Sequence, residues 1–195
     1  MPKKPSDQVT CFKHAMKLLD VIDIPVNDVK VEITGKDPAY DHVWLKVEVG
    51  CLEKVRVVKE SLNAELCKIM NGVKPVDSPI DRLFDGTAMY LRMAKSGERK
   101  GHFGVYNTRD SKSESYKEIW KQTKVDDALR NLIGGLEKCD IDVCVAGAFS
   151  FEEGTRAAVV CRRMYTNETK VVDPTDVAAQ EGVIVVEHED AADEL

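Results

Sequence analysis

Two short segments in the first third of the chain alternate between apolar and other residues with a period of two. In Val29–Thr34 and in Val43–Val49, every second residue is Val, Ile or Leu, and most residues between them are charged or polar. This period matches a β-strand with one buried face, because successive side chains of a strand point to opposite sides. A helix cannot bury such a set on one side, so we expect two strands here, paired as neighbours.

The last third of the chain shows the same kind of pattern. Ile141, Val143 and Val145 alternate with smaller or polar residues, and Arg156–Tyr165 reads as a further strand. Short turn-like segments follow, leading to Lys170–Val172 and Val183–Val186. Strands joined by short turns are typical of an antiparallel meander.

Helical spacing is expected between these strand regions and before them. The sequence predicts helices over about Asp7–Asp20, Lys59–Asn71, Ser78–Lys95, Ser115–Lys124 and Val125–Leu136. Ser78-Pro79 resembles a helix start, and Ser115 with Glu118 resembles a capping box. The segment Leu52–Val58 fits a helix or a strand, and His102–Tyr106 is a candidate for a short strand.

These elements predict an α+β fold, an antiparallel sheet with several helices and a C-terminal β-meander. A chain of 195 residues is long enough for one domain with its own core. We expect a single domain over residues 8–186, a disordered N-terminus over residues 1–7, and an acidic C-terminal tail over residues 187–195.

Charge and aromatic residues concentrate in the stretch from Met89 to Lys124. It holds nine Lys or Arg against four acids, in a protein whose net charge is -6. Five of the chain's aromatic residues also lie there. Cations interleaved with aromatic rings are typical of single-stranded nucleic-acid binding, because the cations follow the phosphates and the rings stack on bases.

The stretch supplies the candidate binding residues. Its loop Gly97–Gly101 has a glycine at each end, which lets backbone N–H groups approach phosphates. The predicted nucleic-acid-binding residues are Arg99, Lys100, His102, Phe103, Tyr106, Arg109, Lys112, Tyr116, Lys117, Trp120 and Lys121. The alternative is that the rings belong to the core and the cations to solvated surfaces.

The C-terminal segment carries the negative charge of the whole protein. Asp173–Leu195 contains eight acids and no Lys or Arg, and the rest of the chain is close to +2. Such a tail can occupy a cationic groove or recruit partner proteins. In layout, a binding body followed by an acidic tail resembles some phage and bacterial single-stranded-DNA-binding proteins.

Other classes are less well supported. No run of apolar residues is long enough for a membrane helix, so no membrane partner is expected. The six scattered cysteines indicate reduced thiols and a cytoplasmic location. No metal-ligand spacing and no cofactor loop occurs, so neither a metal nor a cofactor is expected.

The sequence therefore predicts an intracellular single-stranded DNA- or RNA-binding protein, of the kind that assists replication or recombination in phage or bacteria. Two alternatives stay open. One is a protein-interaction factor, an inhibitor or assembly subunit, that does not bind nucleic acid. The other is an enzyme: a nuclease using Mg²⁺ at Asp20, Asp23 and Asp28, or a hydrolase pairing His102 with Cys144 or Cys161.

Overall fold

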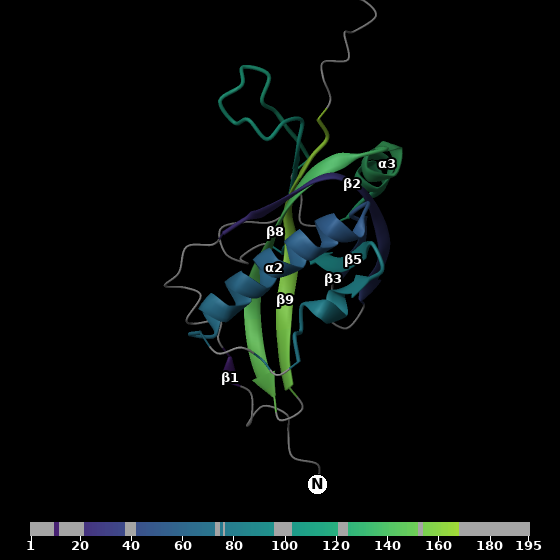
Figure 1. Cartoon of the computed structure of the whole chain (residues 1–195). Coiled ribbons are helices and arrows are strands. Elements are labelled where there is room, and N and C mark those ends of the chain that lie inside the picture. Colours follow the sequence, from purple (N-terminus) through teal and green to yellow (C-terminus); the bar gives the residue numbers. More distant parts are fainter. Residues whose placement is uncertain are drawn as a thin grey trace, which may run out of the picture.

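The fold is built mainly from β-strands (Figure 1). The computed structural model describes residues 10–11, 22–37, 42–72, 75, 77–95, 103–120, 125–151 and 154–167. In chain order the described elements are β1 (Thr10–Cys11), β2 (Ile24–Asp37), β3 (His42–Glu48), α2 (Leu52–Ile69), the 3-10 turn η2 (Asp81–Leu83), β4 (Phe84–Asp85), β5 (Ala88–Met93), β6 (Gly104–Tyr106), β7 (Glu118–Trp120), α3 (Asp127–Gly135), β8 (Cys139–Phe151) and β9 (Gly154–Tyr165).

Five strands close into a barrel in the order β2-β3-β5-β9-β8, with β8 returning to β2. All neighbours in this ring are antiparallel except β5 and β9, which are parallel. Strands β6 and β7 extend the sheet beyond β9, and β1 adds to β8. The expected α+β fold with several helices is therefore wrong: the protein is mostly β, and its described α-helices are α2 and α3.

The alternation of apolar residues fills the barrel. Leu45 and Val47 of β3 are fully buried, and they lie opposite Ile33 and Val31 of β2. Strand β2 pairs with β8 through its first part, Ile24–Val29, and with β3 through its second, and the part paired with β8 contains a bulge between Val26 and Val29. A bulge bends a strand, and this bend lets one strand serve two sides of the barrel. The predicted pairing of the first two strands is confirmed.

The two helices add to the same core. Helix α2 buries Val55, Val58, Leu62, Leu66 and Ile69, a stripe with helical spacing. It includes the segment Leu52–Val58, whose structure the sequence left open. In Figure 1 α2 lies across the long hairpin of β8 and β9. Asp126 is the N-cap of helix α3, and its carboxylate accepts the Leu129 N–H at 2.9 Å.

The predicted helix over Ser78–Lys95 is wrong. After the turn η2 the chain forms the β4–β5 hairpin, in which Asp85 pairs with Ala88. Gly86 takes a φ of 58° in the turn, which glycine adopts without strain. Met89 and Leu91 are buried inside the barrel while Tyr90 points out, so the residues have strand rather than helix periodicity. Asp-Gly is a hairpin-turn signal that the helix prediction overlooked.

The predicted helix over Ser115–Lys124 is also wrong where the structure describes it. Glu118–Trp120 is the strand β7, paired with β6, and residues 121–124 lie outside the described residues. The loop before β7 is held by Asn107, whose side chain donates to Ser115 O at 2.6 Å and accepts from Lys117 N at 2.7 Å. These bonds use the backbone groups that a helix start would need.

Other expected elements meet the structure in part. The strand expected near His102–Tyr106 is found as β6, and α3 and β9 confirm the helix and the strand predicted in those regions. In the range Asp7–Asp20, Thr10–Cys11 is a strand and the remainder lies outside the described residues. The N-terminus 1–7, the segments expected as strands at Lys170–Val172 and Val183–Val186, and the tail 187–195 also lie outside them. Neither described helix combines the length and apolar character needed to cross a membrane.

Candidate nucleic-acid interface

The two largest aromatic candidates lie in the core. Phe103 is 1% exposed and Trp120 is 7% exposed. Their rings meet edge to face, with centroids 5.8 Å apart. An edge-to-face arrangement is one that packed aromatic rings prefer inside a protein. Neither ring offers an open face to a base in this structure.

Tyrosines 106, 116 and 165 form a row of rings beside strands β6 and β9. Tyr106 stacks on Tyr116 with centroids 5.4 Å apart, and it also meets Tyr165 at 6.0 Å. The Tyr106 hydroxyl donates to Glu118 at 3.1 Å. The pKa of Tyr106 is raised to about 12, mainly by burial and also by this hydrogen bond to the Glu118 carboxylate. Tyr116 is the exposed member, at 38%.

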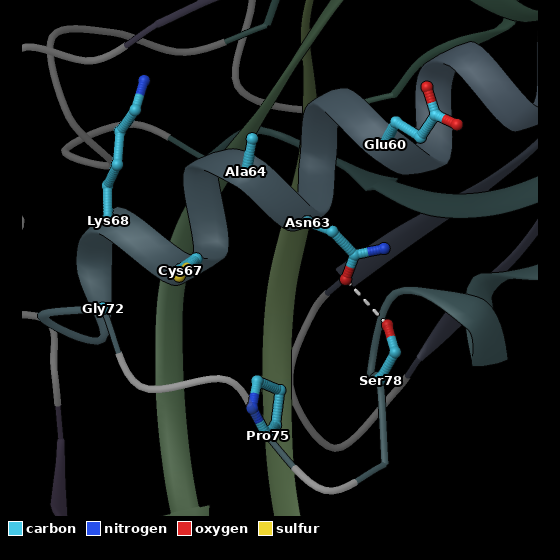
Figure 2. Close-up of a pocket in the computed structure, with 8 residues that line it drawn as sticks. All are labelled: Glu60, Asn63, Ala64, Cys67, Lys68, Gly72, Pro75 and Ser78. Atoms are coloured by element: carbon cyan, nitrogen blue, oxygen red, sulfur yellow. Dashed lines mark hydrogen bonds between the residues drawn. The ribbon is translucent and has the colours of Figure 1, made fainter.

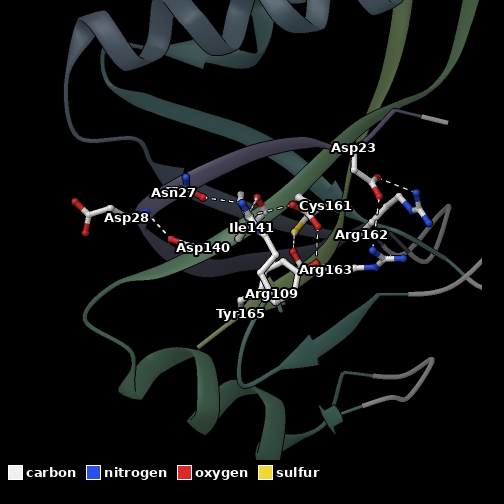
Figure 3. A network of polar contacts seen from close by, with 11 residues as sticks. Asp23, Asn27, Asp28, Arg109, Asp140, Ile141, Cys161, Arg162, Arg163 and Tyr165 are labelled. Carbon is white, nitrogen blue, oxygen red and sulfur yellow. Dashed lines mark hydrogen bonds and ion pairs between the residues drawn. The ribbon is translucent and has the colours of Figure 1, made fainter. Parts of the chain in front are cut away.

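Arg109 lies in the loop between β6 and β7 and reaches back to the barrel (Figure 3). Its guanidinium donates to Asn27 Oδ1 at 2.9 Å and to Ile141 O at 3.1 Å. It is 3.1 Å from the carboxylate of Asp142 and lies over the ring of Tyr165, 4.9 Å from the centroid. Arg109 thus fastens the loop to the barrel.

The remaining predicted residues are divided. Lys112 and Lys117 are exposed on the loop between β6 and β7. Arg99, Lys100, His102 and Lys121 lie outside the described residues. The structure therefore does not bring the described members of the predicted set together as one surface, and the role of the set in binding stays a prediction.

A different surface places exposed rings next to cations. On the outside of the barrel, Trp44 and Lys46 of β3 lie beside Tyr90 and Arg92 of β5; we call these four residues the β3–β5 face. Trp44 pairs directly with Arg92, and Lys46 pairs with Tyr90. Trp44 is 37% exposed and Tyr90 36%. The rings are therefore diagonal neighbours, a spacing of about 7–8 Å between residues in an antiparallel pair.

Sequence reasoning passed over Trp44, because it stood outside the basic stretch. A signal was available: Trp44 and Lys46 occupy the polar phase of an alternating strand, which puts them on the outside. Tyr90 and Arg92 were placed on a helix, and only their pairing with β3 brings the two sets together. At one end of the face, Arg92 Nη1 lies 3.4 Å from His42 Nε2.

Among the residues that the structure describes, the carboxylates of the nuclease alternative are in ion pairs, and the cysteines of the hydrolase alternative are buried. Asp23 Oδ1 is 2.8 Å from Arg162 Nη1, and Asp28 Oδ1 is 3.0 Å from Lys138 Nζ. Asp20 and His102 lie outside the described residues. Burial raises the pKa of the Cys161 thiol, which opposes formation of the nucleophilic thiolate.

A hollow of about 810 Å³ lies between α2 and the segment that follows it (Figure 2). Ala64 and Cys67 contribute to its lining, and Ser78 donates a hydrogen bond to Asn63 Oδ1 at 2.8 Å within it. That bond joins α2 to the segment before η2, so these polar groups serve the chain's own packing.

No protein-family model matches the chain, and no similar protein is found among curated proteins or solved structures.

Proposed function

We propose that the protein binds single-stranded nucleic acid on the β3–β5 face. The observation that carries the proposal is the pairing in that face: two rings, each more than one third exposed, alternate with two cations on adjacent strands. Rings of this kind stack on unpaired bases, and Lys and Arg beside them meet phosphates. Bases in a duplex keep their ring faces stacked inside, so the face suits a single strand.

The barrel supports the same proposal by analogy. Taken along the chain, its strands close in the order first, second, third, fifth, fourth, and the third and fifth are parallel. This arrangement is that of the OB-fold, in which the face of the second and third strands binds oligonucleotides. Here those two strands are β3 and β5. A shared architecture does not fix a function, so the proposal depends on the side chains.

The acidic tail completes the proposal. Residues 187–195 carry five acids and can compete with a polyanion for the same cations, or recruit a partner protein once nucleic acid is bound. Binding of single-stranded nucleic acid together with a tail that competes for the cations or recruits a partner suits a cytoplasmic accessory factor in replication or recombination, in a phage or bacterium. The described cysteines are thiols rather than disulfides, which suits a reducing compartment.

Trp44 provides the test. Because Trp120 is buried, quenching of tryptophan fluorescence by a dT oligomer should come from Trp44 and disappear in Trp44→Phe. Stacking is worth about 1–3 kcal/mol per base, so Trp44→Ala and Tyr90→Ala should each weaken binding by about 5- to 150-fold. Lys46→Ala and Arg92→Ala should lower the slope of log affinity against log salt by about 0.7 each.

Tyr116→Ala is the matched control, because Tyr116 is about as exposed as Tyr90 but lies in the loop before β7. It should bind as the wild type does. A larger loss in Tyr116→Ala than in Tyr90→Ala would move the site to the loop between β6 and β7. If the wild type shows no salt-dependent binding to any oligomer, the protein-interaction alternative replaces this one.

A further inference from the structure

Strand β2 carries a glycine beside the exposed tryptophan. Gly35 is the residue directly opposite Trp44 in the β2–β3 pairing, just after a register shift between Ile33 and Gly35. Trp44 therefore has Arg92 as its neighbour on one side. On the other side stand Gly35, which has no side chain, and the bulge residue Thr34, whose hydroxyl donates to Trp44 O at 3.2 Å. Neighbouring strands are about 4.8 Å apart, so this row of three residues is about 10 Å wide.

The fold itself gives Gly35 no evident reason to be glycine. A Cβ added there would meet nothing within 4 Å. Its backbone is also outside the left-handed region, in contrast to Gly50 and Gly86. Glycine weakens a strand, and in a strand it often marks a bulge or a place where a ligand comes close. The bulge is present, but a bulge with this backbone conformation accepts other residues.

We infer that Gly35 keeps one flank of Trp44 open, and that an unpaired base of a single strand lies there, over β2 and against the indole. This inference rests on the proposed function and extends its site from two strands to three. The bound nucleic acid then crosses the barrel along the row Gly35–Trp44–Arg92. One of its bases lies on the glycine side, and one of its phosphates lies on the arginine side. Stacking of this kind does not depend on base identity, so the ligand class is single-stranded nucleic acid of any sequence.

The row also explains the place of Tyr90. It lies diagonally from Trp44, in the adjacent row with Lys46, where Glu32 is the β2 neighbour. Glu32 puts a carboxylate in that row, 3.7 Å from Lys30 Nζ, whereas the row of Gly35, Trp44 and Arg92 contains no acid. The bound nucleic acid can therefore leave the β3–β5 face toward β2 on the open flank of Trp44.

Substitutions at Gly35 test the inference. Gly35→Val adds a β-branched side chain that suits a strand, so the thermal midpoint should stay the same or rise. The same side chain fills the open flank, and binding of a dT oligomer should weaken about five-fold or more, while Gly35→Ala should stay within about three-fold. Gly134→Val is the matched control: Gly134 also has nothing within 4 Å of an added Cβ, but it lies in α3.

A second measurement separates lost stacking from altered folding. The wild type should bind a dT oligomer more tightly than an abasic oligomer of the same length, and Gly35→Val should reduce that ratio. A parallel pair of RNA oligomers shows which sugar the site accepts, and the effect is expected in the tighter-binding nucleic acid. An unchanged ratio in Gly35→Val, with Trp44→Ala still impaired, overturns this inference alone. Absence of binding by the wild type overturns the proposed function.

Discussion

Removal of the Arg109 guanidinium should destabilise the protein rather than weaken a ligand contact. Arg109→Ala eliminates the hydrogen bonds to Asn27 and to Ile141 O and the ion pair with Asp142 at 3.1 Å. It also removes the contact with the ring of Tyr165. Asp142 is only 6% exposed, so a carboxylate that loses this partner cannot recover full hydration.

The magnitude follows from the burial of the two groups. Breaking a buried ion pair by removing one partner costs about 3–5 kcal/mol, because the other charge stays buried and uncompensated. Here the Arg109 side chain is 34% exposed, and the Tyr165 hydroxyl still donates to Asp142 at 2.6 Å. Both facts reduce the loss, so we expect the free energy of unfolding to fall by about 2–4 kcal/mol at neutral pH.

The pH dependence identifies the cause. Burial raises the pKa of Asp142 above its ordinary value, although the Tyr165 hydrogen bond and the charge of Arg109 act in the opposite direction. A carboxyl whose pKa is raised on folding stabilises the fold below its ordinary pKa, and that contribution is lost as pH rises through the raised value. Arg109→Ala raises the pKa further. Its cost should therefore be largest at neutral pH and shrink as pH falls through the pKa of Asp142.

Urea unfolding at several pH values measures this cost. The matched background is Asp142→Asn, in which Arg109→Ala should cost distinctly less because no buried charge is stranded. Oligonucleotide affinity, measured where both proteins are folded, should be nearly unchanged. If Arg109→Ala leaves stability intact and lowers both the affinity and its salt slope, Arg109 is a phosphate contact and does not fasten the loop to the barrel.

Two further outcomes are expected. Cys51 is exposed and Cys67 half-buried, whereas burial raises the pKa of Cys139 to about 12. Among these cysteines, mass spectrometry after brief labelling of native protein should find Cys51 modified first, and comparable labelling of Cys139 would contradict its burial. Deletion of residues 187–195 should tighten binding to single-stranded DNA, most at low salt, where the Debye length is about 30 Å at 0.01 M. The thermal midpoint should hardly move on that deletion, and unchanged affinity with a large loss of stability would show that the tail is structural.

The local sequence pattern was sufficient to predict several of the strands that form the barrel. The alternation in Val29–Thr34 and Val43–Val49 predicted β2, β3 and their pairing, because period two is a property of a single strand. The region of α3 was also predicted from its own residues, as was β9. Each of these elements buries one face that can be read along the chain without knowledge of its neighbours.

Tertiary pairing decided the rest. Ala88–Met93 is apolar enough for a helix or a strand, and its place between β3 and β9 settles which. The contact of β5 with β9 joins segments far apart in the chain, so no local pattern reports it. Whether a ring is core or surface is decided in the same way. Phe103 and Trp120 pack together inside, whereas Trp44 and Tyr90 are exposed because they lie on the outer face of paired strands. Sequence alone therefore determined most strands and the charge asymmetry. The candidate site required cross-strand neighbours, which exist only once the barrel closes.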